Sequence, residues 1–204
     1  MGLRENGTAS FAATGGGTPI ATYDKLAVMP LLWEAVSVAL TDERWVNPSS
    51  PESNEGMVRA HLLTGEAKAA RMIPLWSAGK TPEEAAAPGG SRDHRPPAVR
   101  RGAAGAWGDD GHIASMFPRN PVLEEAIDPD GARLCLAVPP GKPAPPIPRV
   151  TLTLRALLAT RSIIILIQGE AKRRVIEAAR GGADLPVRCV LTQDRAPVRV
   201  LWSA

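Results

Sequence analysis

The sequence contains few of the residues on which metal sites, disulfides and membrane spans depend. It has two cysteines, Cys135 and Cys189, which stand far apart with no CxxC or Cys/His spacing. Isolated cysteines are typical of buried thiols in a reducing compartment, so we expect no metal site. The longest apolar run, Ile163–Ile167, is far short of the roughly 20 residues that span a bilayer. Residues 1–10 also lack an apolar signal core. These absences predict a cytoplasmic protein with no membrane partner.

Aromatic residues are scarce as well, at 4% of the chain, and this bears on the meaning of its net charge of +3. Residues 91–101 contain four arginines and one aspartate, a net +3, so the rest of the chain is formally neutral. A nucleic-acid-binding protein usually has a basic face interleaved with aromatics, or a recognisable module. Neither is visible in this sequence, and we expect no nucleic-acid partner.

What the sequence does contain is an alternation of short apolar segments and helix signals. A hydrophobic content of 44% over 204 residues suits a single domain, residues 1–204, with a substantial core. Two apolar segments suit strands that are covered on both faces, namely Ala35–Leu40 and Ile163–Gln168. The other expected strands are Ser10–Thr14, Ile73–Leu75, Leu134–Val138 and Val198–Trp202, with helices near 53–63, 155–159 and 170–180. This alternation predicts an α/β protein.

The stretch Gly108–Pro118 brings two acids, a glycine and a histidine into five consecutive residues. Asp110 and Gly111 suit a tight turn, because Asp tolerates and Gly favours backbone conformations closed to bulkier residues. The turn is expected to present His112 at a helix start, where free N–H groups favour anions. A histidine titrates near neutrality, and a nearby carboxylate can set its tautomer and basicity. A capped helix with a surface histidine is the alternative.

A glycine-rich turn follows the first expected strand, at Gly15–Gly17. Three glycines let the backbone approach a ligand closely, and Thr18 is expected to cap the next helix with Pro19 in its first position. A strand, a glycine turn and a helix start together form a phosphate-binding arrangement. The turn matches neither a Walker loop nor a GxGxxG fingerprint, so a plain turn is the alternative.

Charged residues follow the second expected strand, at Asp42, Glu43 and Arg44. In open α/β sheets, ligand groups gather at the carboxyl ends of strands. Arg44 can hold a phosphate or a carboxylate through its planar set of donors. The alternative for Arg44 is an ion pair with Asp42 or Glu43.

Six motifs, taken in order along the chain, resemble those of the 6-phosphogluconolactonase family. They are TGGGTP at residues 14–19, DERWV at 42–46, SNEGMVR at 53–59, GDDGHIASMFP at 108–118, PRVTLTL at 148–154 and GEAKR at 169–173. The resemblance implies an open Rossmann-like α/β fold, with a mostly parallel sheet and helices on both faces, as in glucosamine-6-phosphate deaminases and ribose-5-phosphate isomerases. It also implies hydrolysis of 6-phospho-D-glucono-1,5-lactone to 6-phospho-D-gluconate in the oxidative pentose phosphate pathway.

The resemblance also implies roles for individual residues. His112 is expected to be the general base that activates water, oriented by Asp110. The residues expected to hold the phosphate and the sugar oxygens are Gly15, Gly16, Gly17, Thr18, Asp42, Arg44, Arg149 and Lys172. A lactone is already reactive, so no cofactor, metal or covalent nucleophile is needed, and a positioned base contributes about 10²–10⁴-fold. The lactone is the expected partner, and the protein is expected to be a monomer.

Two other functions stay open. A glucosamine-6-phosphate deaminase-like isomerase shares the DGH turn, but such enzymes tend to follow it with an Asn-Glu-Pro type segment, where this chain has Ser115–Pro118. The other function is that of a catalytically impaired relative that binds sugar phosphates without turnover.

The chain departs from the family pattern in three places. It begins close to the first strand, without the usual N-terminal helical segment, and Gly17 stands where many members have a polar residue. In residues 89–107 it lacks the expected helix and apolar central strand, and a compensated frameshift in the gene is our hypothesis for that gap. Arg100 and Arg101 are expected either to bury unpaired charge or to force the segment out of the sheet. Because net stability is typically about 5–15 kcal/mol, we expect a destabilised, poorly active chain.

Overall fold

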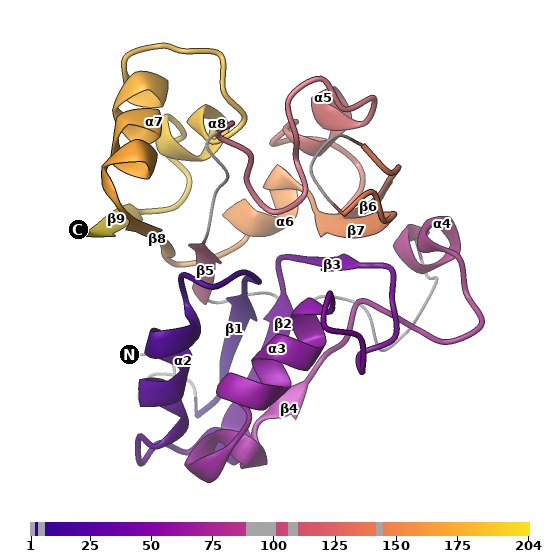
Figure 1. The fold of residues 1–204 in the computed structure, drawn as a ribbon, viewed down its shortest axis with the longest axis vertical. Helices are drawn as coiled ribbons and strands as arrows, with labels where there is room; N and C mark the ends of the chain where they lie inside the picture. Colours follow the sequence, from indigo (N-terminus) through magenta and orange to yellow (C-terminus); the bar gives the residue numbers. More distant parts are fainter. Residues whose placement is uncertain (1–2, 4–6, 89–100, 106–109, 142–144) are drawn as a thin grey trace.

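The fold is built around a six-stranded parallel sheet (Figure 1). A computed structural model describes residues 3, 7–88, 101–105, 110–141 and 145–204, with residues 101–105 described by their backbone. The strand order is β4-β2-β1-β5-β8-β9. The strands are β1 (Ala9–Ala13), β2 (Val36–Leu40), β4 (Arg71–Met72), β5 (Arg101–Gly105), β8 (Ile163–Gln168) and β9 (Val198–Ser203). The chain thus runs outward from β1 to β4 and then returns to the other side of β1, which creates a topological switch point between β1 and β5.

The helices confirm the predicted open α/β fold. In Figure 1, α2 and α3 lie beside β1, β2 and β4, while α7 and α8 lie with β8 and β9 in the other half. The helices are α2 (Ile20–Ala27), α3 (Asn54–His61), α4 (Pro82–Ala86), α5 (Leu123–Ala126), α6 (Leu154–Leu158), α7 (Glu170–Arg180) and α8 (Arg188–Leu191). None of the helices in the described ranges is long and apolar enough to cross a membrane.

A second, three-stranded antiparallel sheet was not predicted. It consists of β3 (Asp42–Arg44), β7 (Arg149–Leu152) and β6 (Cys135–Val138), in the order β3-β7-β6. β3 is short and charged, so it carries none of the apolar alternation by which strands are recognised in a sequence. Its pairing with β7 places Asp42 opposite Thr151 and Arg44 opposite Arg149. Charges that are distant in the sequence therefore become neighbours.

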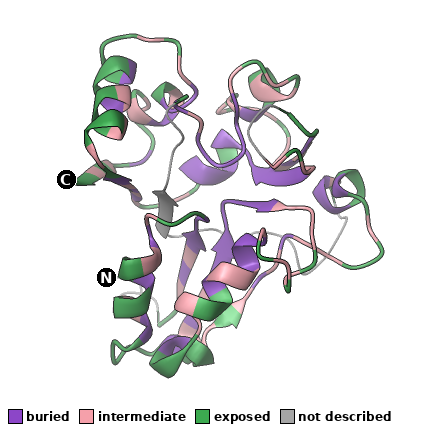
Figure 2. Ribbon diagram, in the orientation of Figure 1, coloured by how far each residue is buried: buried purple, intermediate pink, exposed green. Residues whose placement is uncertain are grey.

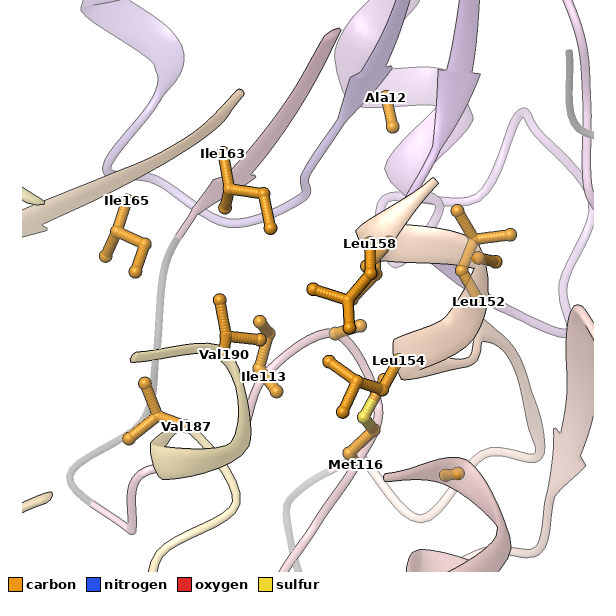
Figure 3. Close-up of a cluster of buried hydrophobic side chains, with 14 of the residues drawn as sticks. Ala12, Ile113, Met116, Leu152, Leu154, Leu158, Ile163, Ile165, Val187 and Val190 are labelled. Atoms are coloured by element: carbon orange, nitrogen blue, oxygen red, sulfur yellow. The ribbon is translucent and has the colours of Figure 1, made fainter. Parts of the chain in front are cut away.

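The hydrophobic core anchors the GDDGH segment. One cluster of buried side chains joins β8, α6 and α8, and it includes Ile113 and Met116 (Figure 3). Each of these two residues is 1% exposed, whereas much of the surface of α7 faces solvent (Figure 2). The residues that directly follow His112 are thus fixed in the core.

The expectation that no strand precedes the GDDGH segment is wrong. Residues Arg101–Gly105 form β5, which pairs in parallel with β1 on one side and with β8 on the other. Backbone N–H and C=O groups make these ladders, so a strand of low apolar content can still fill a gap between two strands. Residues 89–100, which include Arg100 and the region of the expected helix, lie outside the described residues. Upstream, α4 begins with a capping box at Thr81 and ends at Ala86.

Candidate active site

A polar cavity of about 220 Å³ collects most of the predicted site residues, and we call it the central cavity. Its walls come from the loop after β1, from β3, from the start of α3, from the segment around His112, from β7 and from α7. The lining residues are Thr14, Gly15, Gly16, Gly17, Thr18, Asp42, Arg44, Asn54, His112, Ala114, Arg149 and Lys172. All eight residues expected to bind the substrate are in this list, and Thr14, Asn54 and Ala114 join them without having been predicted.

Asp110 is not in the cavity wall, but it bonds directly to His112. The Nδ1 atom of His112 lies 2.6 Å from Asp110 Oδ1, and the His112 backbone N–H donates to the same oxygen over 3.2 Å. The hydrogen bond from the imidazole is the largest cause that lowers the pKa of Asp110, so this carboxyl stays ionised near neutrality. An ionised acceptor at Nδ1 favours the tautomer with the proton on Nδ1 and the lone pair on Nε2.

The segment that presents His112 is a turn and not a helix start, so that prediction and its capped-helix alternative are both wrong. Gly111 has a φ of +69° and Ala114 a φ of +49°, and the next helix, α5, begins only at Leu123. Positive φ values end any helical run, and glycine accepts them without strain. The His112 ring lies tilted against the ring of Phe117, with 4.6 Å between centroids. The turn and this ring contact together fix the imidazole.

The glycine loop approaches the rest of the site very closely. Gly16 has a φ of +85°, and a Cβ atom on Gly15 would lie 1.9 Å from Asn54 Oδ1. Thr18 does not cap α2, contrary to the prediction, because the N-cap position is occupied by Pro19 and no side-chain cap bond is made. The Thr18 hydroxyl lies instead 3.5 Å from Lys172 Nζ, on the first turn of α7. The loop therefore faces a lysine from the opposite half of the sheet.

Asp42 and Arg149 form a buried charged pair beside the cavity. The Ser115 hydroxyl donates to Asp42 Oδ2 over 2.6 Å, and Arg149 Nη1 lies 4.0 Å from the same oxygen. Burial lowers the pKa of Arg149, and the charge of Asp42 opposes that effect. The Arg149 guanidinium also lies over the Phe117 ring, 5.1 Å from its centroid. These contacts hold the Arg149 cation in the cavity wall.

Arg44 forms no ion pair with Asp42 or Glu43 among the described residues, so that alternative is not supported. Its Nη1 donates to Asn54 Oδ1 over 2.6 Å and to the Glu52 carbonyl over 3.0 Å. Its Nε is buried and has no hydrogen-bond partner within the described part of the chain. A buried donor without a partner is unfavourable. Because Arg44 lines the central cavity, its guanidinium can bind an anion there.

Glu43 has a structural position that sequence reasoning missed. Its side chain is fully buried, and its two oxygens accept from the N–H groups of Arg44, Asn54 and Glu55 and from the Ser53 hydroxyl. Burial raises the pKa of Glu43 to about 7, and these hydrogen bonds oppose the rise. Glu43 thus ties β3 to the start of α3. In the sequence, the only sign of this role was the position of Glu43 in DERWV, shortly before the SNEG segment in which α3 begins.

The chemistry available at the site is that of a base and several cations. Within the described ranges, no three His, Cys, Asp or Glu residues lie close enough to hold a metal ion. The base is His112, and the cations that line the cavity are Arg44, Arg149 and Lys172. Such a cavity suits a small anionic substrate whose reaction needs proton transfer.

Comparisons with known proteins agree on one family. The family model for glucosamine-6-phosphate isomerases and 6-phosphogluconolactonases matches residues 2–202. A 6-phosphogluconolactonase from Caulobacter vibrioides is 46% identical over 203 residues, covering 98% of this chain and 86% of that protein.

Solved structures show the same relationship. The structure of a 6-phosphogluconolactonase from Shewanella baltica superposes with a TM-score of 0.89 at 34% identity, covering 100% of this chain and 87% of that one. A monomeric glucosamine-6-phosphate deaminase superposes with a TM-score of 0.74 at 16% identity, covering 97% of this chain and 87% of its own. At that identity the deaminase shows the shared fold alone.

Proposed function

Because the chain belongs to the family of glucosamine-6-phosphate isomerases and 6-phosphogluconolactonases, we propose that it hydrolyses 6-phospho-D-glucono-1,5-lactone to 6-phospho-D-gluconate. This is a reaction of the oxidative pentose phosphate pathway. The observation that carries the proposal is the central cavity, in which one carboxylate-bonded imidazole faces a wall of glycines and cations. The substrate has the matching chemistry, an ester carbonyl at one end and a phosphate at the other.

In the proposed mechanism, His112 acts as the general base. Its Nε2 takes a proton from a water molecule, and the water oxygen attacks the lactone carbonyl carbon. The tetrahedral intermediate then collapses, the bond to the ring oxygen breaks, and that oxygen takes the proton from Nε2. The product acid releases one proton to solvent. Asp110 stabilises the imidazolium that forms in between, through the 2.6 Å contact at Nδ1.

The proposed phosphate-binding group combines Lys172 and Arg44 with the glycine loop. Lys172 lies near Thr18, and Arg44 has a buried Nε without a partner in the described chain. A phosphate dianion accepts several hydrogen bonds, and guanidinium, ammonium and backbone N–H groups are its usual donors. Arg149, which Asp42 holds in place, is assigned to the sugar oxygens.

The decisive experiment compares this chain with its His112→Ala variant, against the spontaneous hydrolysis of the lactone. We expect turnover by the unchanged chain and a loss of about 10²–10⁴-fold in the variant. His61→Ala is the matched control, because His61 is a surface histidine bonded to Asp24. Equal rates for the unchanged chain and His112→Ala would remove His112 from its role. Binding of 6-phospho-D-gluconate without any turnover would favour the impaired-relative alternative.

Assaying glucosamine 6-phosphate in parallel tests the deaminase-like alternative.

We further propose that the enzyme works as a monomer in the cytoplasm. Burial raises the pKa of both thiols, Cys135 and Cys189, to about 12, which suits unreactive cysteines in a reducing compartment. Light scattering of the purified protein tests the monomer.

A further inference from the structure

Asn54 occupies the point where the glycine loop, β3 and α3 meet. It is the first residue of α3, directly after the Ser53 cap, and its residue exposure is 2%. Its side-chain Oδ1 accepts from Arg44 Nη1 over 2.6 Å, and its Nδ2 donates to the Asp42 carbonyl over 2.8 Å. The two ends of the amide are thus used in opposite senses, which fixes the orientation of the group.

The glycine loop fixes the same amide from the other side. A Cβ atom on Gly15 would lie 1.9 Å from Asn54 Oδ1 and 2.3 Å from its Cγ. No side chain at residue 15 is compatible with that approach, so the Asn54 amide lies directly against the loop backbone. The backbone N–H of Asn54 is held as well, by Glu43 Oε1 at 2.7 Å. Asn54 therefore has little freedom to move.

This rigid amide determines how the Arg44 guanidinium is oriented. The guanidinium is planar, with five N–H donors in fixed directions. Its Nη1 is used by Asn54 and by the Glu52 carbonyl, whereas its buried Nε has no partner among the described residues. Fixing one edge of a planar group fixes the other edge. The guanidinium is consequently held in one orientation in the wall of the central cavity, which both Arg44 and Asn54 line.

We infer that Asn54 is a positioning residue for substrate binding: it orients Arg44 so that the guanidinium, held in the cavity wall, binds the anionic group of the substrate. The inference rests on the proposed function for the identity of the substrate. Asn54 acts through Arg44 and not through His112. Its loss is expected to change KM while kcat and the pH profile stay close to those of the unchanged enzyme.

The test is a double-variant cycle on lactone hydrolysis, with Asn54→Ala, Arg44→Ala and both changes together. Loss of a hydrogen bond to a charged group predicts a rise in KM of about tenfold or more for Asn54→Ala. Because Asn54 works through Arg44, the double variant is expected to have the same KM as Arg44→Ala alone. Asn47→Ala is the matched control, since Asn47 is an exposed asparagine with side-chain hydrogen bonds to Ser49.

Several outcomes overturn the inference. They are an unchanged KM in Asn54→Ala, a KM in the double variant equal to the product of the two single effects, or a loss confined to kcat. If Asn54→Ala melts below the assay temperature, Asn54→Ser replaces it in the same cycle with the same expected equality. If the unchanged chain shows no turnover, the proposed hydrolysis fails. The cycle is then measured as binding of 6-phospho-D-gluconate by calorimetry. The inference holds if the double variant has the same Kd as Arg44→Ala, and it fails if the two single effects multiply.

Discussion

Replacing Asp110 by Asn tests the central pairing of the site most directly. The carboxylate accepts from His112 Nδ1 at 2.6 Å, whereas an amide can turn its NH₂ group toward Nδ1 and donate. The proton of the imidazole then moves to Nε2, the atom that must take a proton from water. A hydrogen bond to a charged group contributes about 1.5–3 kcal/mol, and each 1.4 kcal/mol is about tenfold. Loss of the productive tautomer therefore predicts a fall in kcat of about 10–100-fold.

The assay follows the proton that each lactone hydrolysis releases, in weak buffer with a pH indicator and with the spontaneous rate subtracted. Asp130→Asn is the control, because Asp130 is an exposed carboxylate paired with Arg195. A kcat of Asp110→Asn within threefold of the unchanged chain would refute the role of Asp110 in setting the tautomer. A further fall in kcat when Asp110→Asn is added to His112→Ala would also refute that role.

Two further predictions concern stability. Gly111→Ala places a Cβ at a φ of +69° and 3.0 Å from Leu185 Cβ, so we expect a loss of about 1–3 kcal/mol, measured by urea unfolding, together with lower kcat. An unchanged melting curve would contradict this. Burial raises the pKa of Glu43 from 4.5 to about 7, so the folded state holds this proton more tightly than the unfolded state does. The corresponding stability is complete below pH 4.5 and is lost as the pH rises to 7, by roughly 3 kcal/mol at most. Urea unfolding between pH 5 and 8 should show this slope in the unchanged chain and a flatter one in Glu43→Gln; equal slopes would dismiss Glu43 as its source.

The parts of the site that are contiguous in sequence were predictable, and the parts that depend on strand pairing were not. Asp110 and His112 stand two residues apart, so their contact could be expected from the turn alone. Asp42 and Arg149 meet because β3 pairs with β7, and nothing local marks three charged residues as a strand. Asn54 was missed because the first residue of a helix is usually regarded as part of its cap.

The central strand shows a different limit of sequence reasoning. Residues 101–105 read RGAAG, with no strand periodicity, yet they pair with both β1 and β8. Their place is set by the two neighbouring strands and not by their own side-chain pattern. The expectation of a destabilised chain stays a prediction, and a cooperative melt comparable to that of related enzymes would overturn it. Sequencing the gene tests the frameshift hypothesis for residues 89–107.

The return of the chain to β1 after β4 has a consequence for biosynthesis. The central cavity takes its walls from both ends of the sequence, from Thr14 to Lys172. A nascent chain on the ribosome can bury its first β-α units early. The part of the cavity wall that Lys172 supplies is missing, however, until α7 has been translated. Contacts between such remote segments form slowly, because chain entropy opposes them until late in folding. We therefore expect substrate affinity only after α7 has been translated, and a product terminated before Lys172 is expected to bind neither the lactone nor its product.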